Sequence, residues 1–121
     1  MKASMAQALK RLPGAPAAAY PEGVPFTTVM AHGSMSVEVF APGSNAGGRD
    51  RQQPHAQDEL YLVHRGSGQL VMDGQRIDCA AGDTLFVAAG TLHRFEQFSD
   101  DFVTWVVFYG PQGGERVNEH E

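Results

Sequence analysis

The chain has 121 residues, which is enough for one domain with a sizeable core but too few for two domains with separate hydrophobic interiors. Its 42% hydrophobic content, with seven Phe, three Tyr and one Trp, is typical of a folded globular protein. The 9 basic and 14 acidic residues give a net charge of −5, which disfavours nucleic acid and anionic membrane surfaces as partners.

The cysteine content and the N-terminus both bear on where the protein works. A single cysteine, Cys79, cannot close an intramolecular disulfide, and this is typical of a reducing compartment. Lys10 and Arg11 interrupt the N-terminal stretch before an apolar run of signal-peptide length forms. No run approaches the ~20 apolar residues that a membrane helix requires. We therefore expect a cytoplasmic protein with no membrane partner.

Residues 1–25 are expected to form an N-terminal helix and arm. A short amphipathic helix over residues 2–12 is predicted because apolar side chains share one helical face, at Met5, Ala8, Leu9 and Leu12. Pro13 and Gly14 end this helix. The Ala- and Pro-rich segment 13–25 then predicts a connecting arm that lies over the protein surface or over a partner subunit.

Residues 26–111 have the pattern of an all-β domain of about eight strands. Short apolar and β-branched runs alternate with Gly, Pro, Asn and Asp clusters, and Asp73-Gly74 predicts a tight type I′ hairpin. Such regular spacing indicates a sandwich, jelly roll or closed barrel. Residues 112–121 are polar and predict a flexible tail. From Phe26 onward, the expected strands include residues 35–40, 60–64, 68–72, 75–79, 84–87, 93–98 and 102–109.

Two segments carry residues that could bind a metal ion. In the first, Gln53, His55 and Glu59 fall at odd positions, so an extended chain projects them to one side, opposite Leu60 and Leu62. The second segment adds His93 at the start of an expected strand. Two imidazoles and one carboxylate form the set that holds Fe(II), Mn(II), Ni(II), Zn(II) or Co(II) and leaves positions open for water or substrate.

Gln53 has two interpretations, because an amide oxygen is a weaker ligand than an imidazole. It could fill a fourth coordination position directly, or it could form a hydrogen bond to a metal-bound water.

These two segments resemble the two conserved motifs of the cupin superfamily. In the first motif Gln53 stands where a histidine is usual; in the second, Ala88 stands for the usual proline and Gln97 for the usual asparagine. All the spacings agree. The matching positions are Gly47, Gln53, His55, Glu59 and Gly66 in the first motif, and Gly82, Ala88, Gly90, His93 and Gln97 in the second.

The resemblance implies a single jelly-roll β-barrel of six to eight strands. It also implies that Gln53, His55, Glu59 and His93 point inward at one end of the barrel, around one divalent transition metal ion. Function is left open, because the superfamily includes enzymes, sugar-binding modules and storage proteins.

Three further residues share strand parity with Glu59 or His93, so they could line the same cavity and contact a small ligand. They are Tyr61, Phe95 and Gln97, and core packing is the alternative for Phe95. Trp105 and Tyr109 share a face of the last strand, where they serve the core or a dimer contact. We expect a homodimer, because a small β-barrel leaves sheet edges that need cover.

Three hypotheses for the function remain. The first is a metal-dependent enzyme, of dioxygenase or isomerase type, that acts on a small organic substrate. The second is a non-catalytic module that binds a small polar ligand beside a structural metal. The third is a metal-free protein whose site has begun to degenerate at Gln53, which the retained His55, Glu59 and His93 disfavour.

Overall fold

The computed structural model describes residues 1–44 and 50–116. Within these ranges the chain forms eight strands, one short helix and one 3-10 turn, and no helix is long and apolar enough to cross a membrane. The elements are α1 (Met5–Leu9), β1 (Phe26–His32), β2 (Met35–Phe40), η1 (Pro42–Ser44), β3 (Asp58–Arg65), β4 (Ser67–Met72), β5 (Gln75–Ala80), β6 (Thr84–Val87), β7 (His93–Glu96) and β8 (Val103–Tyr109).

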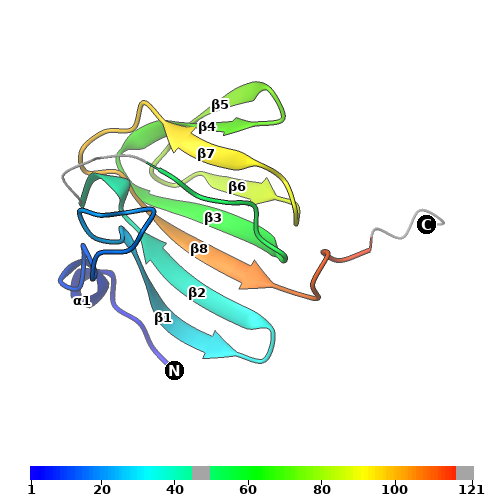
Figure 1. The fold of residues 1–121 in the computed structure, drawn as a ribbon, viewed down its shortest axis with the longest axis horizontal. Coiled ribbons are helices and arrows are strands. Elements are labelled where there is room, and N and C mark those ends of the chain that lie inside the picture. Colours follow the sequence, from blue (N-terminus) through cyan, green and yellow to red (C-terminus); the bar gives the residue numbers. More distant parts are fainter. Residues whose placement is uncertain (45–49, 117–121) are drawn as a thin grey trace.

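The strands form two antiparallel sheets (Figure 1). The larger sheet has the order β1-β2-β8-β3-β6, and the smaller has the order β5-β4-β7. Strands that are distant in the sequence are therefore neighbours, as β8 is between β2 and β3. This arrangement is a jelly-roll β-barrel, as the sequence predicts.

The barrel interior is apolar and takes side chains from both sheets. On β3, Tyr61 and Val63 are buried, while Leu60 and Leu62, which alternate with them, lie half-buried on the opposite face. Leu70 and Phe95 enter the same cluster from the smaller sheet. The predicted alternation along this strand is thus confirmed, and it places Glu59 on the inner face beside Tyr61.

A second apolar cluster lies on the outer face of the larger sheet, under the N-terminal helix. Ala8 of α1 is fully buried against Val39 and Val103. The helix is shorter than predicted, Met5–Leu9 and not residues 2–12. It starts at Ser4, whose Oγ accepts a hydrogen bond from the Gln7 N–H, and Lys10 already caps its C-terminal end.

The arm after α1 lies against its own barrel. The Tyr20 hydroxyl accepts a hydrogen bond from the backbone N–H of Arg51, at 2.9 Å. The Arg51 guanidinium donates to the Ala19 carbonyl oxygen, at 2.7 Å. The arm is thereby joined to the segment that leads into β3.

One turn confirms its sequence signal, and one strand is shorter than expected. Asp73 and Gly74 have φ angles of 50° and 74°, as the type I′ hairpin requires. The strand expected over residues 93–98 ends at Glu96, because Gln97 adopts a left-handed φ of 49°. The alternation that links Gln97 to His93 therefore stops before Gln97. Gly47 and residues 117–121 of the expected tail lie outside the described residues.

Candidate metal centre

Three predicted ligands, His55, Glu59 and His93, meet inside the barrel. Glu59 is the second residue of β3, His93 is the first residue of β7, and His55 lies in the segment before β3. One ligand atom from each lies within 4.8 Å of the other two. A hydrogen bond from the Gly90 N–H to the His55 carbonyl oxygen, at 2.7 Å, ties the turn before β7 to the segment before β3.

Glu59 is the residue whose environment most needs a cation. Its side chain is 1% exposed, and neither carboxylate oxygen has a hydrogen-bond partner among the described residues. Oε1 lies 2.6 Å from His93 Nε2, an ion-pair distance without hydrogen-bond geometry. A buried carboxylate without donors is costly, and a metal ion would offset that cost. The residues present therefore fit a divalent cation.

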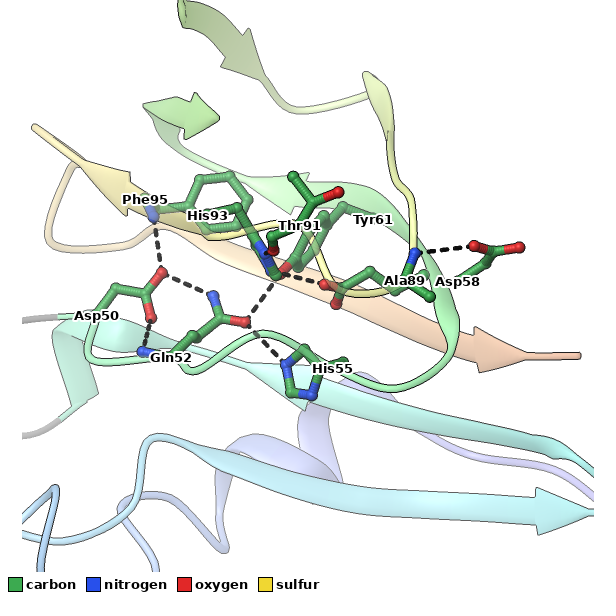
Figure 2. Close-up of polar contacts among 10 residues, drawn as sticks. Asp50, Gln52, His55, Asp58, Tyr61, Ala89, Thr91, His93 and Phe95 are labelled. Atoms are coloured by element: carbon green, nitrogen blue, oxygen red, sulfur yellow. Dashed lines mark hydrogen bonds and ion pairs between the residues drawn. The ribbon is translucent and has the colours of Figure 1, made fainter. Parts of the chain in front are cut away.

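His93 is oriented for ligation by a backbone carbonyl. Its Nδ1 lies 2.8 Å from the Thr91 carbonyl oxygen (Figure 2). A proton on Nδ1 therefore leaves the lone pair of Nε2 directed at Glu59 Oε1, which lies 2.6 Å away. Burial alone would lower the pKa of His93, but the Glu59 carboxylate, the Thr91 carbonyl and the Asp50 charge together outweigh burial and raise that pKa. The position thus attracts positive charge, which a metal ion would supply in place of a proton.

His55 is held as a neutral imidazole. Burial lowers its pKa, although the charge of Glu59 acts in the opposite direction. Its ring lies 5.8 Å from the ring of His93 and 4.6 Å from that of Phe108, measured between centroids. Because only the neutral imidazole binds a metal, this environment favours ligation.

The hydroxyl of Tyr61 lies beside His93, and its contact with a small ligand stays a prediction. This hydroxyl is 3.0 Å from His93 Nε2 and donates to Gln52 Oε1, also at 3.0 Å. Burial, together with the charges of Glu59 and Asp50, holds the pKa of Tyr61 well above its usual value, so the phenol stays neutral.

Phe95, Gln97 and Gln53 occupy three different environments. Phe95 is buried in the core, and its ring packs edge-on against Tyr61 at 4.9 Å. Gln97 is exposed and lines a different, outer pocket together with Asp50 and Phe95. Gln53 is also exposed, so its role as a fourth ligand stays a prediction.

The sequence interpretation missed three residues around the site, Gln52, Asp50 and Glu38. Gln52 Oε1 lies 3.5 Å from His55 Nε2, and Gln52 Nε2 donates to Asp50 Oδ2 at 2.7 Å (Figure 2). Glu38 faces inward on β2, where it is paired with Val106 of β8. Strand parity could have identified Glu38, because it alternates with Val37 and Val39.

A pocket of about 220 Å³ lies next to the candidate ligands. Its walls are mainly apolar, and Tyr20 of the arm and Phe26 of β1 form part of them. Glu38 and His55 supply polar groups. Burial raises the pKa of Glu38 to about 7, and the negative charge of Glu59 acts in the same direction.

Comparison with known proteins agrees with this fold. The structure is a two-sheet jelly roll in which His55, Glu59 and His93 lie close enough together to hold a metal ion. Residues 36–109 match the family model described as the Cupin domain. Because the match covers more than half of the chain, the protein belongs to the cupin family.

The chain is also similar to individual proteins. An uncharacterized protein of Streptomyces coelicolor is 38% identical over 79 residues, which cover 65% of this chain and 73% of the relative. KdgF from Halomonas sp. is similar in structure, with a TM-score of 0.59 and 16% identity over 72% of this chain and 78% of that chain. A cupin 2 conserved barrel domain protein from Salinispora arenicola has a TM-score of 0.53 and 23% identity over 70% of this chain and 74% of that chain. At these identities the two structures support the fold alone.

Proposed function

We propose that this protein binds one divalent transition metal ion through His55, Glu59 and His93 and is a metal-dependent enzyme, of dioxygenase or isomerase type, on a small organic substrate. The observation that carries the proposal is the buried Glu59 carboxylate, which has no hydrogen-bond donor among residues 1–44 and 50–116 and lies close to two imidazoles. Iron, manganese, nickel, zinc and cobalt all suit this ligand set.

The adjoining pocket supports a small substrate. At about 220 Å³ it is smaller than the roughly 300–1,000 Å³ usual for drug-sized ligands. His55 lies in its wall, so a molecule bound there is beside the candidate metal centre. When bound, the metal would act as a Lewis acid or as the site of O₂ activation.

Glu38 is the chain's candidate for proton transfer. It lines the pocket, and burial holds its pKa at about 7, where a carboxyl group both gives and accepts protons at neutral pH. The apolar side chains around it, Phe40, Val106 and Phe108, would exclude water from a bound substrate.

Turnover by the metal-loaded protein tests this proposal. Metal-free protein is loaded in turn with Fe(II), Mn(II), Ni(II), Zn(II) or Co(II) and given small hydroxy acids, keto acids, enediols and phenols. O₂ uptake and isomer formation are measured, with His93→Ala as the control. We expect turnover with at least one metal and none in the control. Saturable ligand binding without turnover in any metal form would instead support the non-catalytic module.

A further inference from the structure

Gln52 presents an amide oxygen to the candidate metal centre. Its Oε1 lies 3.5 Å from His55 Nε2, and it accepts a hydrogen bond from the Tyr61 hydroxyl at 3.0 Å. Figure 2 shows the Gln52 side chain between Asp50 on one side and His55 and Tyr61 on the other. An oxygen at this place is close enough to share a cation with the imidazole.

Asp50 fixes the direction of the Gln52 amide. The Asp50 side chain accepts hydrogen bonds from Gln52 Nε2 at 2.7 Å, from the Gln52 N–H at 3.1 Å and from the Phe95 N–H at 2.7 Å. Because a carboxylate accepts hydrogen bonds and does not donate them, the NH₂ end of Gln52 must face Asp50. The oxygen end is therefore the end that faces His55.

The hydrogen bonds leave lone pairs free around one point. A proton on His93 Nδ1 goes to the Thr91 carbonyl, which leaves the Nε2 lone pair available. The Tyr61 hydroxyl donates its single proton to Gln52 Oε1, whose second lone pair faces His55 Nε2 at 3.5 Å. Glu59 adds two oxygens without hydrogen-bond partners among the residues that the structure describes. When both imidazoles carry their proton on Nδ1, these nitrogen and oxygen ligand atoms face one another without a proton between them, as a cation site requires.

Gln53, which occupies the ligand position of the family motif, has a different environment from Gln52. It is exposed, and although it lines the same pocket of about 220 Å³ as Gln52 and His55, it makes no side-chain hydrogen bond to the candidate ligands among the described residues. By strand parity Gln53 would share a side with His55, but the segment before β3 is not a regular strand. The contacts of Gln52 show instead that Gln52 is the glutamine directed at His55 and Tyr61.

We propose that Gln52, and not Gln53, is the amide residue of the metal centre, with its Oε1 as a weak fourth ligand beside His55, Glu59 and His93. This inference rests on the proposed metal binding. It assigns the fourth position one residue earlier in the chain than the family motif does. Asp50 acts as a positioning residue, because it orients the amide without reaching the metal.

The test is a calorimetric titration of metal-free protein with Ni(II) alone. Three proteins are compared, wild type, Gln52→Ala and the matched neighbour Gln53→Ala. We expect Gln52→Ala to bind Ni(II) about tenfold more weakly and Gln53→Ala to remain within about twofold of wild type. Equal affinity in Gln52→Ala and wild type, or an equal loss in Gln53→Ala, would overturn the assignment. If wild type bound no metal, the proposed function would fail first.

A measurement on wild type covers the case in which Gln52→Ala does not fold. Side-chain amide resonances of ¹⁵N-labelled protein are recorded as Zn(II), which is diamagnetic, is added. The Gln52 side-chain amide should shift strongly on metal binding, and that of Gln53 should barely change. A shift confined to Gln53 would refute the proposal without any substitution.

Discussion

The Glu59 carboxylate is buried and has no hydrogen-bond donor in the part of the chain that the structure describes. Burying such a group destabilises the fold unless a cation is bound beside it. A second carboxylate on the same inner face, that of Glu38, is only half-buried and lines the pocket. The two carboxylates therefore provide a matched pair, in which Glu59 is a proposed metal ligand and Glu38 is not.

The first prediction separates these two residues by metal affinity. Glu59→Gln should weaken Ni(II) binding by more than the roughly 10- to 100-fold that outer-shell partners contribute, because a direct ligand loses its charge. Glu38→Gln should leave the affinity close to that of wild type. Calorimetric titration of both variants is the measurement. Comparable losses in the two variants would show that the metal does not depend on Glu59 in particular.

Glu38 should also make the stability of the metal-free protein depend on pH. Its pKa is raised from 4.5 to about 7 in the folded chain, first by burial and then by Glu59. The folded state therefore favours the protonated form, so stability present at acidic pH is lost as the pH rises from 4.5 through about 7. Glu38→Gln removes this loss. At pH 8 the variant should be more stable than wild type by on the order of 2 kcal/mol.

Urea unfolding at several pH values measures this difference. The gap between Glu38→Gln and wild type should shrink steadily toward pH 4.5. Glu22→Gln, on the exposed part of the arm, is the control and should show no such trend. A gap that stays constant with pH would mean that Glu38 does not titrate as described.

Among the elements, β3 and the segment before it show what the sequence could and could not predict. Side chains of β3 alternate between the two faces of the sheet, so the sequence alone predicts that Glu59 and Tyr61 point inward. The segment before β3 has no ladder, and its direction is set by Asp50 and its hydrogen bonds. The sequence therefore identified His55 by spacing but could not tell which adjacent glutamine turns inward.

The ends of elements were harder to predict than their existence. β7 stops at Glu96, because Gln97 takes a left-handed backbone conformation that nothing in its residue type requires. By contrast, the positive φ angles of Asp73 and Gly74 follow directly from the Asp-Gly turn signal. A backbone conformation that the residue type itself favours can be predicted from the sequence. A conformation that tertiary contacts impose cannot.

Gly66, which closes the first motif, has a structural role in the turn between β3 and β4. Its φ is +79°, and an added Cβ would lie 2.4 Å from Ser99 Oγ and 2.8 Å from Phe102 Cα. Gly66→Ala should therefore lower the free energy of unfolding by on the order of 3 kcal/mol. Gly74→Ala is the matched control, because its φ is +74° but nothing lies within 4 Å of the added Cβ.

The control isolates the steric part of this prediction. Gly74→Ala pays only the backbone cost of a left-handed residue, about 1 kcal/mol. Urea unfolding of both metal-free variants gives the comparison. Equal losses would show that crowding at Ser99 and Phe102 does not contribute.

For the whole molecule, the outer face of the larger sheet is covered unevenly. The helix α1 packs over Val39 and Val103. Beyond it an apolar row crosses four strands, with Val37 opposite Val107, Val107 opposite Leu60, and Leu60 opposite Phe86. Phe86, on the edge strand β6, is 50% exposed. This row is where the expected homodimer would bury apolar surface.

The dimer is tested by sedimentation at micromolar concentration. Wild type should sediment as a dimer, and Phe86→Glu should shift it toward monomer, because a charge would then lie in the apolar contact. Gln75→Glu, an equal charge on the smaller sheet, should leave the dimer intact. A monomeric wild type would contradict the expected homodimer.

The central claim is that the barrel holds one metal ion, and elemental analysis of untreated protein tests it most directly. Purified without chelator, the protein should carry about one equivalent of divalent metal per chain, whichever metal the Irving–Williams order favours during expression. His93→Ala, prepared in the same way, should carry almost none. Because binding stabilises the folded state, adding Ni(II) to the metal-free protein should also raise its unfolding temperature. Wild type that contains no metal and gains no stability from Ni(II), Mn(II), Fe(II), Zn(II) or Co(II) would contradict the account.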